Sequence, residues 1–175
     1  MDLREKTISE EYKYKGKAIN LKVEEVQLPN GKVATREIVE HPGAVAIIPI
    51  LDNGNVILVE QFRKALDEVI LEFPAGKLHK NEELESCAMR ELEEETGYKA
   101  NNMEFLGKLA MAPGFADEII YVYRATGLYK GETNWDEDEF INIKNLSMDE
   151  IKSLIKEGKI YDAKTVAAMW MLSSK

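Results

Sequence analysis

The chain has few cysteines, histidines and prolines, and it has no long hydrophobic run. Its 175 residues include one Cys, two His and five Pro. The lone Cys87 excludes an intrachain disulfide, so we expect a protein of the reducing cytoplasm. The longest apolar run, residues 43–51, is too short to span a bilayer, and residues 1–10 lack the apolar core of a signal peptide. Disulfide scaffolds and transmembrane proteins are therefore excluded.

Positive charge is also scarce. Lys and Arg number 23 against 32 Asp and Glu, which gives a formal net charge of -9. Nucleic acids and anionic membranes attract cationic surfaces, so we expect neither as a partner. An anionic substrate would need bound cations or local arginines to approach this chain. The length and an apolar fraction of 45% predict one globular domain with at most a small accessory element.

Alternation of polar and apolar residues indicates where the strands and helices lie. Residues 1–41 predict an antiparallel hairpin or meander, too polar to be stable alone, which should pack on the main domain (42–175) or on another subunit. In the main domain we expect a tight hairpin turn at 52–55 between strands 43–51 and 56–63, and a loop at 76–81. Further strands are expected at 69–73, 103–113, 119–128 and 140–146, and helices at about 82–96, 148–157 and 164–173. This order predicts an α+β fold, a three-layer α/β/α sandwich around a mixed sheet, with an N-terminal antiparallel β extension.

The expected helix at 82–96 carries an unusual density of carboxylates. On a helix, Glu91, Glu94 and Glu95 share one face. Arg90 lies one turn before Glu94 and should pair with it, and Gly97 stands where a C-cap belongs. Three clustered carboxylates suit a hard divalent cation such as Mg2+ or Mn2+. The alternative is a solvated acidic face of an ordinary surface helix.

The spacing of these residues resembles the Nudix box at each fixed position. Those positions are Gly76, Glu82, Arg90, Glu91, Leu92, Glu94, Glu95, Gly97 and Tyr98. The resemblance implies the Nudix fold and Mg2+-dependent hydrolysis of a nucleoside diphosphate linked to another group, with Mn2+ as an alternative metal. It also implies that Glu91, Glu95 and the carbonyl of Ala75 ligate metal, with Glu94 close by. Arg90 would orient the cluster, while Glu82 is either part of the site or an ordinary charge at the helix N-terminus.

Segments outside the box resemble the ADP-ribose pyrophosphatase branch of this family. They include the stretches VEQFR, LEFPAGK and APGFADE, in which Pro113 follows Gly97 by sixteen residues. This resemblance implies hydrolysis of ADP-ribose to AMP and ribose 5-phosphate. It places substrate contacts at Arg36, Arg63, Glu72, Pro113 and Gly114. The alternatives are that Arg63 only pairs with a glutamate, and that Glu72 is an ordinary charge at a strand end.

The same branch draws its catalytic base from a late acidic loop, here residues 135–139. Glu139 is our first candidate and Glu137 the second, with Glu94 as an alternative within the box. The branch also forms homodimers that exchange N-terminal strands. Tyr12 or Tyr14 would then stack on adenine, although packing in the sheet is the simpler role for either one.

Other functions remain open from the sequence. The substrate could be another nucleoside diphosphate sugar or a dinucleotide, with the same chemistry. A non-catalytic module that senses ADP-ribose is a different class of function, but such modules typically have degraded boxes, and this box is intact.

Overall fold

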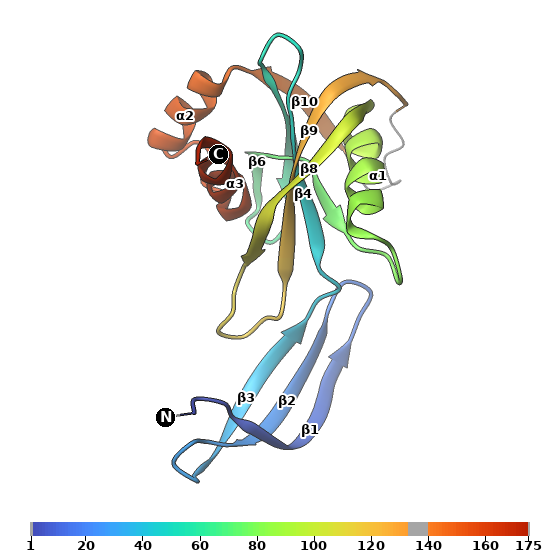
Figure 1. Ribbon diagram of the computed structural model, residues 1–175. Coiled ribbons are helices and arrows are strands. Elements are labelled where there is room, and N and C mark those ends of the chain that lie inside the picture. Colours follow the sequence, from blue (N-terminus) through green and yellow to red (C-terminus); the bar gives the residue numbers. More distant parts are fainter. Residues whose placement is uncertain (1, 133–139, 175) are drawn as a thin grey trace. The chain divides into compact units, whose positions relative to one another are not determined.

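A computed structural model describes residues 2–132 and 140–174 (Figure 1). The proposed bases Glu137 and Glu139 lie outside these described residues. The chain divides into two compact units, one formed by residues 1–43 with 110–119 and the other by residues 44–109 with 120–175. No helix among the described residues is long and apolar enough to cross a membrane.

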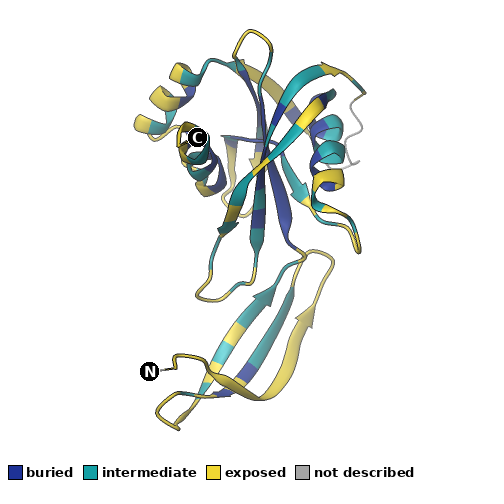
Figure 2. Ribbon diagram, viewed as in Figure 1, coloured by how far each residue is buried: buried dark blue, intermediate teal, exposed yellow. Residues whose placement is uncertain are grey.

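The first unit is built on a three-stranded antiparallel sheet. Its order is β1 (Lys6–Lys15), β2 (Asn20–Gln27) and β3 (Val33–Glu40). The predicted antiparallel extension is therefore confirmed in its meander form, although the sequence did not locate β1, which is exposed along its whole length (Figure 2). Val26 is the one buried apolar side chain among the described residues of this unit. Backbone pairing and charge pairs must then supply much of its cohesion.

Lys22 is the centre of those charge pairs. Its Nζ lies 2.8 Å from Glu24, 3.2 Å from Glu40 and 3.4 Å from Glu10. The hydrogen bonds to Glu24 and Glu40 raise the pKa of Lys22 well above its usual range. One lysine thus neutralises carboxylates from all three strands of the sheet.

The second unit contains the two remaining sheets and the helices. Its strands are β4 (Ala44–Pro49), β5 (Val56–Arg63), β6 (Glu68–Glu72), β7 (Ala75–Lys77), β8 (Tyr98–Ala110), β9 (Ile119–Lys130) and β10 (Ile141–Leu146), the ends of β8 and β9 reaching into the first unit. Its helices are α1 (Leu84–Thr96), α2 (Met148–Lys156) and α3 (Ala163–Ser173). One sheet has the order β7-β4-β9-β8, in which β4 and β9 are parallel, and the other has the order β10-β5-β6.

The side chains of β4 alternate between two cores. Val45 and Ile47 pack with Ala88 and Leu92 of α1. Ile48 belongs to a second core, to which α2 and α3 contribute Ile151, Ala168 and Met169. Helices therefore cover both faces of this sheet, with α1 on one side and α2 and α3 on the other (Figure 1). The three-layer α/β/α sandwich is confirmed.

Two local expectations were wrong. The turn after β4 forms, with Leu51 N–H donating to Asn55 O at 2.8 Å, but β4 and β5 do not continue as a hairpin. Beyond an isolated bridge between Ile50 and Val56, β5 pairs with β6 and β10 in the other sheet. The expected loop at 76–81 also begins as a strand, because Ala75–Lys77 forms β7 against β4.

Candidate functional site

Helix α1 is positioned by its apolar side and by its cap. Ala88 and Leu92 are fully buried, and Gly97 ends the helix in the left-handed region at φ 68°. Its N–H donates to Glu93 O at 2.8 Å, as a glycine C-cap does. This orientation buries Glu95, which is 3% exposed, and leaves Glu91 and Glu94 partly exposed on the flank of the helix.

Arg90 joins the carboxylates of the box. Its Nη1 donates to Glu91 at 2.6 Å and to Glu94 at 2.9 Å, so the pair with Glu94 that the sequence predicts is present. Its Nε and Nη2 donate to Glu82 at 2.8 and 2.9 Å. These bonds, chiefly the pair with Glu82, raise the pKa of Arg90 above its usual range. A single guanidinium therefore fixes three carboxylates, whose mutual repulsion it offsets.

Glu82 is an anchor for Arg90. It lies just before the helix, where it accepts from Arg90 through both oxygens and from the backbone N–H of His79 at 2.9 Å. The donors of Arg90 lower the pKa of Glu82 to about 2. The sequence left the role of Glu82 open, because no local sequence pattern predicts that it forms a bidentate pair with Arg90.

The backbone of β7 lies directly against this cluster. Ala75 N–H donates to Glu95 Oε2 at 3.1 Å. A β-carbon built at Gly76 would lie 1.9 Å from the carboxyl carbon of Glu91 and 2.0 and 2.1 Å from its oxygens. Only a residue without a side chain allows this approach. Glu91 and Glu95 therefore both converge on the Ala75–Gly76 backbone.

This donor set fits a hard divalent cation. Carboxylate and backbone carbonyl oxygens are the ligands that Mg2+ and Mn2+ take in proteins. Among the described residues no three His, Cys, Asp or Glu side chains adopt an arrangement that would hold a metal, and Arg90 neutralises Glu91 and Glu94 instead. The chemistry of the donors and their convergence on the Ala75–Gly76 backbone favour a cation site here.

Arg63 and Glu72 form a second charged pair in the same unit. Arg63 Nε donates to Glu72 Oε1 at 2.6 Å, so Arg63 does pair with a glutamate. The two Nη groups of Arg63 have no hydrogen-bond partner among the described residues, and its side chain is 39% exposed. Glu72 is 1% exposed and is also paired with Lys164, which sequence reasoning missed. Glu72 is thus a buried ion-pair partner rather than a solvated charge at a strand end.

The remaining expected substrate contacts belong to the first unit. Arg36 lies on β3, and its Nε donates to Glu5 at 2.9 Å. Pro113 and Gly114 occupy an exposed turn between β8 and β9. This turn is tied to β3, because Val39 N–H donates to Phe115 O at 2.7 Å and Asp117 N–H donates to Val39 O at 3.1 Å. Arg36 and the Pro113–Gly114 turn are therefore carried by one compact unit.

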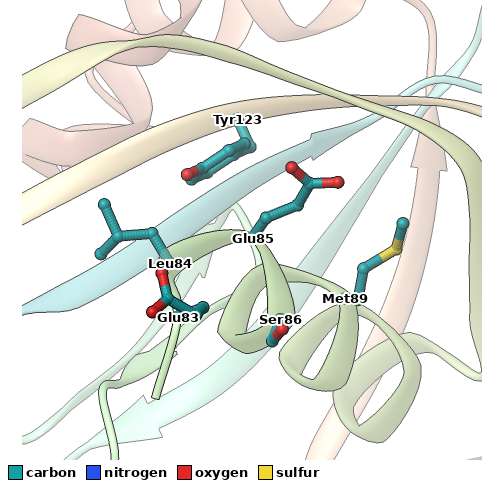
Figure 3. Close-up of a pocket in the computed structure, with 6 residues that line it drawn as sticks. All are labelled: Glu83, Leu84, Glu85, Ser86, Met89 and Tyr123. Carbon is teal, nitrogen blue, oxygen red and sulfur yellow. The ribbon is translucent and has the colours of Figure 1, made fainter. Parts of the chain in front are cut away.

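A pocket of about 740 Å³ lies elsewhere on α1. Tyr123 of β9 and residues from the N-terminal half of the helix line it (Figure 3). One of these residues, Met89, points about 160° away from Glu91 around the helix axis. The pocket contains none of the expected site residues, so it is not the candidate active site.

The fold and the carboxylate helix define a class of protein. The NUDIX domain model matches residues 40–169, and the model of the nucleoside diphosphate sugar hydrolase N-terminal domain matches residues 5–39. The chain therefore belongs to the Nudix family.

Two relatives and one solved structure are similar to this chain over nearly its whole length. The chain is 51% identical to the "Methanol dehydrogenase activator" of Bacillus methanolicus, over 96% of this chain and 92% of that protein. It is 47% identical to the "ADP-ribose pyrophosphatase" of Bacillus subtilis strain 168, over 99% of this chain and 95% of that protein. A structure described as "Crystal structure of ADP compounds hydrolase" superposes with a TM-score of 0.88 at 24% identity, over 99% of this chain and 95% of that one, which shows the shared fold.

Proposed function

We propose that this chain is a Nudix pyrophosphohydrolase that cleaves the diphosphate bond of ADP-ribose to give AMP and ribose 5-phosphate. The observation that carries the proposal is the convergence of Glu91 and Glu95 on the Ala75–Gly76 backbone, beside Glu94 and Arg90. The relative named as an ADP-ribose pyrophosphatase aligns over nearly the whole chain and supports this choice of substrate.

The proposed reaction depends on Mg2+, with Mn2+ as an alternative. Glu91, Glu94, Glu95 and the carbonyl of Ala75 would hold the ion. A divalent ion held there would supply neutralisation of charge on the diphosphate and activation of water. Arg90 keeps the carboxylates in place before the substrate arrives. Glu139, with Glu137 as second choice, or Glu94 within the box would take the proton from the attacking water.

Cationic side chains would bind the substrate. The Nη groups of Arg63, which have no hydrogen-bond partner among the described residues, can make the bidentate contact that guanidinium groups make with phosphate oxygens. Glu72 orients Arg63, and Arg36, Pro113 and Gly114 are the other proposed substrate contacts. These assignments explain how an acidic chain accepts an anionic substrate.

We extend the proposal to the organisation of the chain. Residues 1–41 form an antiparallel sheet that exchanges strands in a homodimer, and residues 42–175 form the hydrolase domain. The exposure of β1 and the shortage of buried apolar residues in its sheet support a need for further contacts. Tyr12 and Tyr14, both exposed on β1, are the candidates to stack on adenine.

The direct test is AMP release from ADP-ribose with and without Mg2+. We expect Glu95→Gln to abolish turnover while the protein keeps its circular dichroism spectrum. Glu85→Gln is the matched control, because Glu85 is exposed on the same helix and belongs to none of the proposed ligand sets. Full activity of Glu95→Gln, or activity that EDTA does not reduce, would contradict the proposed metal site.

Substrate choice needs its own assay. ADP-ribose, ADP-glucose, NADH and diadenosine polyphosphates should be compared at equal concentration by kcat/KM. We expect ADP-ribose to be preferred. A clear preference for another nucleoside diphosphate sugar or a dinucleotide would support diphosphate hydrolysis but reject ADP-ribose as the substrate. Binding without turnover of any compound would favour the non-catalytic module that senses ADP-ribose.

A second candidate function comes from the relative named as a methanol dehydrogenase activator, which is 51% identical to this chain. A protein of this kind would raise the rate of a dehydrogenase that is added to the assay. The measurement is the rate of a methanol dehydrogenase with and without this protein, with Glu95→Gln as the comparison. Activation that survives in Glu95→Gln would separate this function from diphosphate hydrolysis.

A further inference from the structure

A series of charge pairs links the partly exposed Arg63, through the buried Glu72, to the buried Lys164 at the start of α3. Glu72 accepts from Arg63 Nε through Oε1 and from Lys164 Nζ through Oε2, and Lys164 Nζ also donates to Asp162 at 3.0 Å. Lys164 is 7% exposed and Glu72 is 1% exposed. Lysine is rarely buried so deeply, and neither the box nor the proposed chemistry uses it.

The backbone around these charge pairs fixes their position. Asp162 caps α3 by accepting from Thr165 N–H at 3.0 Å and from Thr165 Oγ1 at 2.7 Å. Thr165 Oγ1 in turn accepts from Phe73 N–H at 2.9 Å. The first turn of α3 is therefore attached to the residue that follows Glu72, and Lys164 has little freedom to move.

Stability alone is a weak reason for this arrangement. Moving two charges out of water carries a large free-energy cost for each ion, and well-packed apolar side chains often stabilise a fold as well as a buried ion pair does. A function that depends on the geometry of the pair is a better reason to keep it.

The geometry affects Arg63 directly. Because each oxygen of Glu72 is engaged by a different cation, its carboxylate cannot rotate without breaking one of the two pairs. Arg63 is then held through Nε alone, which leaves both Nη groups without a partner among the described residues. A guanidinium held in this way is already oriented for a bidentate contact, so less conformational freedom is lost when an anion binds.

We propose that Lys164 is a positioning residue for substrate binding: it fixes Glu72, and through Glu72 it presents the Nη groups of Arg63 to the diphosphate of the substrate. This inference rests on the proposed function. It assigns Lys164 no contact with the substrate and no part in the cleavage step. Glu72 acts as a fixed link between the two cations, with both of its oxygens engaged.

The test is a kinetic double-mutant cycle of Lys164→Met and Arg63→Met with ADP-ribose and Mg2+. We expect each single variant to raise KM by about tenfold, with kcat within about threefold of wild type, because a binding contact is lost. The double variant should be no worse than Arg63→Met, because Lys164 acts through Arg63. Lys156→Met, which removes an exposed lysine of α2, is the matched control and should leave both constants unchanged.

Each other outcome has a defined meaning. A lower melting temperature with unchanged KM in Lys164→Met, or effects that multiply in the double variant, would overturn the inference and leave the proposed function standing. If Lys164→Met does not fold, Glu72→Gln/Lys164→Met removes both charges of the pair and is expected to fold with the same raised KM, and an unchanged KM there also overturns the inference. A wild-type protein that binds no ADP-ribose in calorimetry and does not hydrolyse it would refute the proposed function, and the inference with it.

Discussion

Arg90 holds Glu82 with two parallel hydrogen bonds, from Nε at 2.8 Å and from Nη2 at 2.9 Å. The bonds close the loop between β7 and α1, since Glu82 lies before the helix and Arg90 lies within it. With these two donors engaged, Nη1 is directed at Glu91 and Glu94. Glu82 therefore acts on the carboxylate cluster through Arg90.

Replacing Glu82 tests this relationship. We expect Glu82→Gln to lower kcat by about tenfold, because Arg90 loses its bidentate anchor and the box carboxylates lose their orientation. The free energy of unfolding should fall by about 1.5–3 kcal/mol, the range for a hydrogen bond to a charged group. Glu83→Gln is the control, since Glu83 is exposed and its side chain makes no capping hydrogen bond. Equal losses in the two variants would argue against a specific role for Glu82.

The same pair predicts a dependence of stability on pH. Arg90 lowers the pKa of Glu82 from its ordinary value of 4.5 to about 2, so unfolding exposes a carboxyl that binds a proton more readily. The stabilisation is fully present above about pH 4.5 and is lost as the pH falls through about 2. Urea unfolding of wild type and Glu82→Gln between pH 2 and 6 should give a difference that shrinks toward pH 2. A constant difference would contradict the shifted pKa.

A further prediction concerns the close approach of β7 to the site. An alanine at Gly76 would place its β-carbon 1.9 Å from the carboxyl carbon of Glu91, so Glu91 must move. Because displacements of about 1 Å at a catalytic centre can cost on the order of 100-fold in rate, we expect Gly76→Ala to lose activity on that scale. Gly107→Ala is the control, since its nearest neighbour is the flexible end of Met171 at 3.3 Å. The measurement is kcat, checked against retained secondary structure by circular dichroism.

Local patterns predicted much of the fold and missed its long-range pairs. The strand at Val56–Arg63 followed from the turn signal before it and its apolar run, and the helix end at Gly97 followed from a glycine cap. Strand β1 was not located, because all of its residues are exposed and no burial pattern marks it. The switch of β5 to a second sheet and the pairing of Lys164 with Glu72, which lie 92 residues apart, depend on tertiary packing. The carboxylate face of α1 was predictable because a helix fixes it locally.

The single thiol should be unreactive in the folded protein. Cys87 is fully buried against the core of α1, and burial raises the pKa of its thiol to about 12. The thiolate is the reactive form, so it is scarce at pH 8. We expect a thiol reagent such as DTNB to react at least 100-fold more slowly with the native protein than with protein in concentrated urea. Rapid labelling of the native protein would show that α1 opens readily.

Gln61 provides a test of how much an unpaired buried amide lowers the free energy of unfolding. It is 8% exposed on β5, and its Oε1 is buried without a hydrogen-bond partner among the described residues. An unpaired buried polar group costs about 1–3 kcal/mol.

Methionine has nearly the shape of glutamine and no polar amide, so we expect Gln61→Met to raise the free energy of unfolding by about 1 kcal/mol. The chain's other glutamine, Gln27, is exposed on β2, and Gln27→Met should leave the stability of the second unit unchanged. Urea unfolding monitored by tryptophan fluorescence suits both variants, because Trp170 lies on α3 in the second unit. A loss of stability in Gln61→Met would mean that this amide is satisfied in solution, by ordered water or by a residue outside the described part of the chain.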